Sequence, residues 1–294
     1  MLIDPALAFH TGERQAQALS GLDAPRTPPI RDHMPDQHRE FFAALPFLLL
    51  ATEQEGWPVP TILTGAPGFL QSPDPQTLTI AALPAPEDPA AALLRPDALV
   101  GMLGIDLATR RRNRMNGRIA SAGPNGLEID VLESFGNCPK YINRRELQPI
   151  PAGPGEPIER FEGLDRDAAD AVATSDALFV ASFAAGGVDI SHRGGVPGFV
   201  TVEGARLSVP DFSGNRYFNT LGNLLLNPKA AILLVDFERG DLLCLQGLAE
   251  IEWRADDAPG GAERVWRLAV QRGWRRRAAL PLRWRRLNNA SSLD

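Results

Sequence analysis

The chain has 294 residues and a mass of 31.8 kDa, enough for one large or two modest domains with a full core. Its 44% hydrophobic and 22% charged composition, with a net charge of −6, excludes a disordered, collagen-like or coiled-coil chain. It has no apolar run of the roughly 20 residues that span a bilayer, no signal-peptide pattern, and only two cysteines, too few for a disulfide framework or a zinc site. We therefore expect a cytoplasmic protein without a bound metal.

The first half of the chain predicts short strands separated by turns. Apolar runs bounded by Gly, Pro and Asn are typical of such strands, and Pro124-Asn125-Gly126 is a turn signal between two of them. Helices are expected at Gln37–Ala44 and at the Ala- and Leu-rich segment Pro89–Leu94. The expected strands are Pro46–Thr52, Thr61–Leu63, Gly68–Gln71, Thr77–Ala81, Leu99–Asp106, Gly117–Ser121 and Leu127–Glu133.

The second half predicts the same order of elements. A helix at Tyr217–Leu226 is stopped by Asn227-Pro228, and further helices are expected at Arg166–Thr174 and Ala262–Gln271. The expected strands are Ala177–Phe183, Phe199–Val202, Leu207–Val209, Ala230–Phe237 and Leu242–Trp253. Short antiparallel strands with a helix inserted late indicate a small barrel in each half.

The two halves of the sequence align with each other at an offset of 130 residues. Across residues 48–120 the shift gives 11 identities in 73 positions, among them Pro67-Gly68-Phe69 over Pro197-Gly198-Phe199. A period this long indicates duplicated domains rather than a solenoid, although two unrelated β segments could share such turn residues. The expected division is an N-terminal arm (1–35), a first half (36–150), a Pro- and Gly-rich linker (151–165), a second half (166–255) and a C-terminal tail with a helix (256–294).

The charge is unevenly distributed along the chain. Residues Arg264 to Arg286 hold nine arginines and no acid, so the rest of the chain carries −15. This tail is either an ordinary Arg-rich surface or a contact for another subunit, a nucleic acid or an anionic partner, since arginine forks bind carboxylate and phosphate. The acidic remainder argues against a nucleic-acid binder.

Two polar segments of the second half are candidates for a phosphate site. Ser191-His192-Arg193 precedes two glycines, which let a backbone approach a ligand closely, while arginine supplies a fork for phosphate. Gly214-Asn215-Arg216 opens a helix, where backbone N–H groups favour an anion. Each segment alone also fits a solvated hairpin or a helix cap.

The first half lacks these polar residues at the equivalent positions. Thr61-Ile62-Leu63 stand opposite Ser191-His192-Arg193, and Ala85-Pro86 stand opposite Asn215-Arg216. The run Arg110 to Arg114 is interpreted here as a solvated stretch of charge. Residues 133–142, with Lys140 and Tyr141, are either a ligand wall at the junction of the halves or the start of a helix.

These motifs resemble a known family. SHRGGVPGFV, LSVPDFSGNRYFNTLGNLLLNP and AILLVDFERGDLLCLQGLAEI, in this order within residues 175–253, look like the FMN-binding split barrel of the pyridoxamine 5′-phosphate oxidase-like superfamily. PFLLLATEQEGWPVPTILTGAPGFL and ESFGNCPKYINRRE resemble the N-terminal part of longer members. The resemblance implies a mainly β fold with flanking helices: two tandem split-barrel units, each six-stranded, antiparallel and of Greek-key type.

The resemblance also implies FMN at the interface between the units. A tandem duplication would build within one chain the interface that relatives form as dimers. The residues expected at the cofactor are Lys140, Tyr141, Ser191, His192, Arg193, Gly194, Phe199, Asn215, Arg216 and Thr220. No acid or base stands out as catalytic, and no phosphate set like that of the vitamin B6 oxidase itself is evident.

Two classes of function follow from the resemblance. One is an FMN-dependent oxidoreductase that acts on a small molecule with an electron donor, neither of which the sequence identifies. The other is a non-catalytic flavin carrier or interaction module with a degenerate barrel. The Arg-rich tail is a candidate contact for a second copy of the chain or for a reductase.

Overall fold

The computed structural model describes residues 9–21, 30–151, 153, 155–184, 187–253 and 261–287. The helices among them are α1 (Thr11–Leu19), α2 (Asp36–Ala43), α3 (Arg166–Thr174) and α4 (Asn219–Leu226), with a 3₁₀ helix η1 at Ala91–Leu93. The strands before α3 are β1 (Phe47–Gln54), β2 (Trp57–Thr64), β3 (Leu70–Gln71), β4 (Thr77–Ile80), β5 (Leu99–Asp106), β6 (Arg111–Gly123), β7 (Gly126–Gly136), β8 (Arg145–Pro149) and β9 (Glu159–Glu162). The strands after α3 are β10 (Ala177–Ala184), β11 (Gly187–Gly194), β12 (Thr201–Glu203), β13 (Arg206–Asp211), β14 (Lys229–Val235), β15 (Leu242–Glu252), β16 (Arg264–Arg276) and β17 (Leu282–Arg286).

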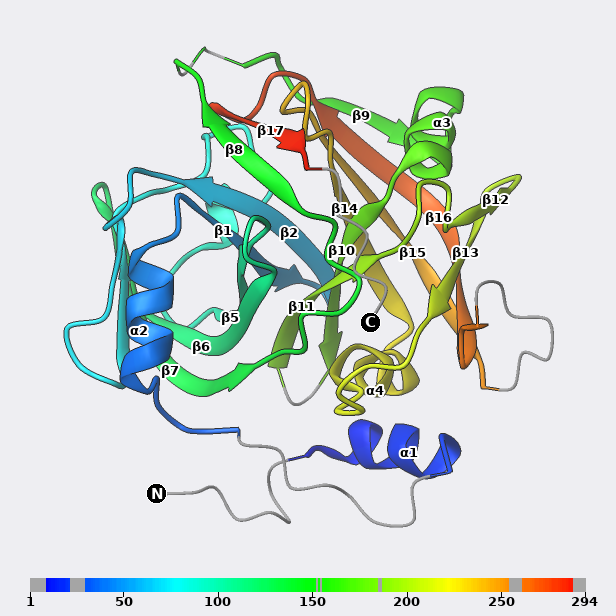
Figure 1. Cartoon of the computed structure of the whole chain (residues 1–294), viewed down its shortest axis with the longest axis horizontal. Coiled ribbons are helices and arrows are strands. Elements are labelled where there is room, and N and C mark those ends of the chain that lie inside the picture. The colour runs from blue at the N-terminus through cyan, green and yellow to red at the C-terminus, as the bar shows by residue number, and fades with distance from the viewer. Residues whose placement is uncertain are drawn as a thin grey trace.

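Two curved antiparallel sheets with the same strand order lie side by side (Figure 1). The first sheet has the order β2-β1-β5-β6-β7-β4-β3, and the second has the order β11-β10-β14-β15-β16-β13-β12. Each of these paths holds seven strands where six were expected, because the short strands β3 and β12 each pair with a neighbour and extend the path. The mainly β fold of two tandem units is therefore as the sequence predicts.

The 130-residue shift relates the strands as well as the sequence. Strand β1 begins at Phe47 and β10 at Ala177, β2 at Trp57 and β11 at Gly187, and β5 at Leu99 and β14 at Lys229. Close packing repeats at the same interval. A Cβ atom on Gly65 would lie 2.5 Å from the ring of Phe69, and one on Gly195 would lie 2.6 Å from Phe199. Each aromatic ring therefore needs a glycine beneath it.

Strands β1 and β10, each next to the edge strand of its sheet, are apolar on both faces. In β1, Leu48 and Leu50 face the core of the first sheet, while Leu49 faces an apolar layer between the sheets. In β10, Leu178 faces the core of the second sheet and Phe179 faces that shared layer. A strand covered on both faces has a continuous run of apolar residues rather than alternating polar and apolar ones. These segments could therefore be recognised as strands from the sequence.

The two sheets approach each other closely at the shared layer. A Cβ atom on Gly101 of β5 would lie 2.6 Å from the carbonyl oxygen of Val188 on β11, so this contact requires glycine. Above the layer, the ring of Trp284 on β17 makes edge contacts with Phe47 at 5.3 Å and Phe237 at 5.4 Å. Strand β17 pairs with β8 in a two-stranded ribbon that crosses from one half to the other (Figure 1).

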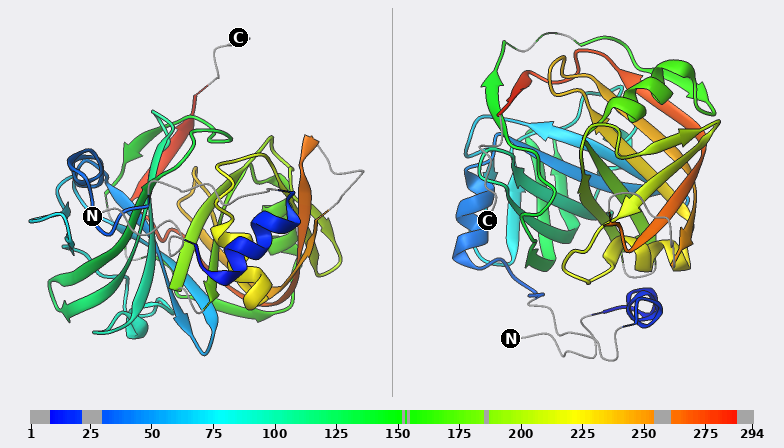
Figure 2. Two further views of the ribbon diagram at one scale, coloured as in Figure 1. Left: turned by 90° about the horizontal axis from the view of Figure 1, so that it is seen from below. Right: turned by 45° about the vertical axis from the view of Figure 1, so that its right-hand side comes forward.

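Helix α1 of the N-terminal arm lies against α4 of the second half (Figure 2). A Cβ atom on Gly12 would lie 2.1 Å from the carbonyl oxygen of Gly222, so two glycines let the helices touch. The Glu13 carboxylate accepts a hydrogen bond from Asn219. Burial raises the pKa of Glu13 to about 7.

The C-terminal segment differs from the expected tail. Residues predicted as a helix at Ala262–Gln271 belong to strand β16, between β15 and β13 in the second sheet. The pattern there has period two, because Trp266, Leu268 and Val270 point into the core and Ala269 is exposed. The segment is rich in Ala, Arg and Leu, which favour a helix locally and make this alternation hard to recognise. Packing against the neighbouring strands outweighs that local preference and makes the segment a strand. The expected linker likewise contains β9, which pairs with β16, and the segment expected as a helix at Pro89–Leu94 forms only the single 3₁₀ turn η1.

The arginines of this segment pair with carboxylates of the same chain. Arg275 contacts Asp165, Asp167 and Glu159. Further pairs are Arg264–Asp211, Arg267–Glu252, Arg276–Glu87, Arg277–Asp167, Arg285–Glu146 and Arg286–Asp176. The charge asymmetry along the sequence is thus largely balanced within the folded chain. Among the described helices, none has the length and apolar character to cross a membrane.

Candidate functional site

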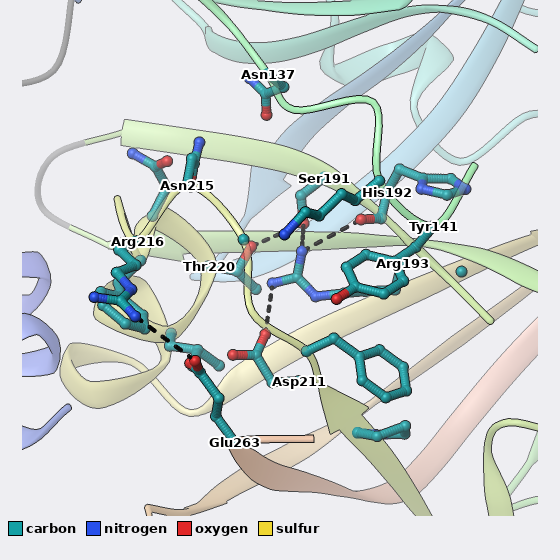
Figure 3. A pocket seen from close by; sticks show the side chains of 18 of the residues that line it. Asn137, Tyr141, Ser191, His192, Arg193, Asp211, Asn215, Arg216, Thr220 and Glu263 are labelled. Carbon is teal, nitrogen blue, oxygen red and sulfur yellow. Dashed lines mark hydrogen bonds and ion pairs between the residues drawn. The ribbon is translucent and has the colours of Figure 1, made fainter. Parts of the chain in front are cut away.

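A cleft lies where the two halves meet at the edge strand β11 (Figure 3). The first half contributes β6 and the connection from β7 to β8. The second half contributes β11, the loop from β13 to α4, the first turn of α4 and the start of β16. The polar residues of the lining are Arg112, Arg114, Asn137, Lys140, Tyr141, Ser191, His192, Arg193, Asp211, Asn215, Arg216, Asn219, Thr220, Glu263 and Arg264.

Of the residues expected at a cofactor, nine line this cleft and Phe199 does not. The nine are Lys140, Tyr141, Ser191, His192, Arg193, Gly194, Asn215, Arg216 and Thr220. Phe199 is only 7% exposed and packs into the core of the second sheet, where its ring covers Gly195. An apolar ring beside a glycine-rich turn was assigned to the ligand, but it belongs to the core.

Strand β11 presents Ser191 and Arg193 on one face, two positions apart. The Ser191 hydroxyl lies 2.8 Å from the hydroxyl of Thr220, and the Arg193 guanidinium donates to the Ser191 oxygen at 3.3 Å. Asp211 lies 3.5 Å from the other end of Arg193. These contacts hold the guanidinium at one wall of the cleft, as Figure 3 shows.

The loop before α4 turns sharply to reach the cleft. Arg216 and Phe218 have positive φ angles of 61° and 62°, a region that side chains other than glycine visit rarely. The Asn215 side chain accepts the backbone N–H of Tyr217 at 3.1 Å and braces the loop. Helix α4 begins without a side-chain cap, so the backbone N–H groups of its first turn lack that partner. Its first residues, Asn219, Thr220 and Leu221, line the cleft.

Strand β6 supplies two arginines that the sequence reasoning missed. Arg114 is only 4% exposed, forms a buried ion pair with Asp189 of β11, and donates to Asn219 at 3.1 Å. Arg112 lies two positions earlier on the same face and also lines the cleft. Interpreting the run Arg110 to Arg114 as solvated charge was therefore wrong for these two residues. The alternation at 112 and 114 was the signal available, since a strand sends every second side chain to one face.

His192 faces the other side of β11, toward Arg112. Its Nδ1 atom lies 3.2 Å from Nη1 of Arg112. A guanidinium only donates, so Nδ1 accepts and the proton of the neutral ring sits on Nε2. Burial, followed by the charges of Arg112, Arg193 and Arg145, holds the pKa of His192 well below its ordinary value. The ring is therefore a neutral donor and acceptor at physiological pH.

Tyr141 and Phe212 form an aromatic wall across the mouth of the cleft. Their rings stack with centroids 5.0 Å apart and planes at 24°, and the Tyr141 hydroxyl donates to the Ser213 carbonyl at 3.3 Å. Asn137 and Lys140 belong to the same connection. No helix begins in this segment, which runs from β7 to β8 without regular structure.

The cleft carries an excess of positive charge. Six cationic side chains line it, against the two carboxylates of Asp211 and Glu263. Burial lowers the pKa of Arg112 to about 10 and of Arg114 to about 9, with Arg193 adding to both shifts, so both remain charged at neutral pH. Among the described residues, no group of His, Cys, Asp and Glu is placed to hold a metal ion. The arrangement is suited to binding an anion.

The equivalent position in the other half lacks these groups. A shift of 130 residues carries Arg112 to Leu242 and Arg114 to Cys244, and both are apolar side chains packed between the sheets. At the position equivalent to Ser191, Thr61 donates to the half-buried Asp88 at 2.8 Å. Only one of the two related positions therefore presents a cationic cleft within the described residues.

Comparisons with known proteins give structural matches only. No protein-family model matches the chain, and no curated protein matches it. The HupZ protein of Group A Streptococcus is 19% identical, covering 36% of this chain and 89% of its own, with a TM-score of 0.30. An FAD-binding protein from Mesorhizobium loti is 10% identical, covering 41% and 98%, with a TM-score of 0.31.

A third match names the group that the sequence resembles. A putative pyridoxamine 5′-phosphate oxidase from Corynebacterium glutamicum is 12% identical, covering 43% of this chain and 98% of its own, with a TM-score of 0.29. Each of these matches covers about two fifths of this chain. The strand order of the chain itself defines the two curved antiparallel sheets independently of these matches.

Proposed function

We propose that the cleft binds FMN and that the chain is a flavoprotein of the pyridoxamine 5′-phosphate oxidase-like class. The observation that carries this proposal is the cationic cleft between the halves, which gathers nine residues assigned to a cofactor from sequence alone. We further propose that the two units arose by duplication of one barrel, since strands β1, β2 and β5 recur 130 residues later.

The residues present fit an anionic cofactor. The buried Nε–H of Arg193 has no hydrogen-bond partner among the described residues, and buried donors are rarely left so. The phosphate would lie at the second-half wall, held by Arg193, Arg216 and the N–H groups at the start of α4. Ser191 and Thr220 would add hydroxyl donors there.

The protein's part is to bind and orient the cofactor. FMN supplies hydride and electron transfer, the chemistry that the side chains themselves lack. Tyr141 and Phe212 offer an aromatic surface to a flat ring. His192 stays neutral with its proton on Nε2, and because this N–H is buried without a partner among the described residues, it is free to donate a hydrogen bond to a bound ligand.

A non-catalytic flavin carrier is the second candidate. It is favoured by the state of His192, because its lowered pKa keeps the ring neutral and so unable to act as a cationic acid. Turnover of NADH or NADPH with an electron acceptor would separate an oxidoreductase from a carrier.

The absorption spectrum of the purified full chain tests the binding itself. We expect a yellow protein, or one that turns yellow with added FMN, and a cofactor released on denaturation with the mass of FMN. A colourless protein that leaves the fluorescence of added FMN unchanged would remove the proposal.

A further inference from the structure

Arg112 is the one cationic side chain of β6 in the cleft that has no acidic partner among the described residues. Arg114 pairs with Asp189, and on the opposite wall Arg193 and Arg216 lie near Asp211 and Glu263. Within the described part of the chain, the Arg112 guanidinium has a hydrogen-bonding contact only with the neutral His192. A largely buried charge without a countercharge is costly, so a group from outside the chain would stabilise it.

The free edge of this guanidinium has a defined shape. Nη1 contacts His192, and the buried Nε has no partner in the described ranges. No hydrogen bond of Nη2 to a described residue is present either. Nε and Nη2 form the side of the guanidinium that matches the two oxygens of a carboxylate. His192 therefore acts as a positioning residue, because its Nδ1 fixes which edge of Arg112 stays open.

Asn137 supplies a further donor beside this edge. Its backbone N–H donates to the carbonyl of Arg112 at 3.2 Å, which continues the β6–β7 register of Asn113 and Gly136. Residues directly opposite in an antiparallel pair send their side chains to the same face. The buried Nδ2 group of Asn137 likewise has no partner among the residues that the structure describes, and Asn137 lines the same cleft.

We infer that Arg112 and Asn137 form a subsite for a carboxylate, separate from the phosphate site of the second half. The cleft would then hold two anionic groups, one on each wall. Resting on the proposed function, this makes the substrate of the flavin a small organic acid whose carboxylate is bound by the first half. The alternative source of an anion at this edge is the phosphate of FMN itself.

Benzoate is a suitable probe, titrated by calorimetry into the full chain with and without FMN. We expect the parent to bind benzoate in both states and to ignore benzamide, which lacks the charge. Arg112→Gln should weaken benzoate binding at least tenfold while changing FMN affinity less than threefold. Arg112→Lys should recover only part of the loss, because the ammonium lacks the fork. Arg267→Gln, outside the cleft, is the matched control and should bind benzoate like the parent.

Three results would overturn the inference. The first is that the parent does not bind benzoate, and the second is that the Arg112→Gln variant binds benzoate as tightly as the parent. The third is that FMN abolishes benzoate binding while Arg112→Gln strongly lowers the affinity for FMN, which would assign this edge to the flavin phosphate. If FMN does not bind at all, the proposed function falls, but the benzoate titration of the flavin-free chain still decides the carboxylate subsite.

Discussion

Replacing Arg216 by Ala should weaken FMN binding more than replacing Arg112 by Ala. A charge-assisted hydrogen bond to phosphate contributes about 1.5–3 kcal/mol, which corresponds to roughly 10- to 100-fold in affinity. The Arg216 side chain is 42% exposed and only loosely paired with Glu263 at 3.9 Å, so solvent screening favours the lower end. We expect a loss of about tenfold for Arg216→Ala.

Fluorescence titration of FMN against the purified full-length variants measures this difference. Arg267→Ala is the matched control: its side chain is 36% exposed and paired with Glu252 at 2.6 Å, but it lies on β16 outside the cleft. Equal thermal stability of the three variants would exclude a folding defect. Equal affinities of Arg216→Ala and the parent, or a larger loss in Arg112→Ala, would refute the phosphate placement.

Three further predictions follow from the packing and the charges. Gly101→Val should lower the free energy of unfolding by about 1–3 kcal/mol in urea, since the new side chain meets the Val188 backbone, whereas Gly123→Ala, with open space around it, should not. Burial raises the pKa of Glu13 from 4.5 to about 7, so the folded chain binds this proton more tightly than the unfolded chain does. The free energy of unfolding should therefore fall by up to about 3 kcal/mol as the pH rises through that window. A Glu13→Gln variant whose free energy of unfolding depends on pH as steeply as that of the parent would contradict this. The full chain should bind one FMN and not two, because Leu242 and Cys244 stand where the cleft has arginines; a ratio of two by calorimetry would be inconsistent with this.

Much of the fold could be predicted from the sequence because the local residue patterns and the tertiary packing favour the same helices and strands. Helix α3 spans Arg166–Thr174 as expected, with Asp165 accepting the N–H of Ala168 as its cap. Strands β5 and β10 read as apolar runs because both of their faces are covered. The 130-residue shift was detectable because glycines under Phe69 and Phe199 are required in both halves.

The misinterpreted elements are those whose environment is set by distant parts of the chain. Strand β16 contains helix-favouring residues, and only its partners β13 and β15 make it a strand. Strands β8 and β17 are five residues each and depend on one another across more than a hundred residues of sequence. Short segments of this kind carry too little local pattern to be assigned.

For a related reason, only one of the two walls of the candidate site could be predicted from the sequence. The second-half wall lies in two contiguous motifs around Arg193 and Arg216, which sequence reasoning can find. The first-half wall is made of Arg112 and Arg114, whose burial depends on β11 and α4 covering them. A run of arginines is usually solvated, and here only the fold distinguishes the buried ones.

Comparing FMN with riboflavin tests the central claim most directly, because the two flavins differ only in the phosphate. If the cleft holds FMN with its phosphate against Arg193, Arg216 and the start of α4, FMN should bind at least about tenfold more tightly than riboflavin to the full chain. Raising the salt concentration should narrow that difference. Equal affinities for the two flavins, or binding of neither, would contradict the account.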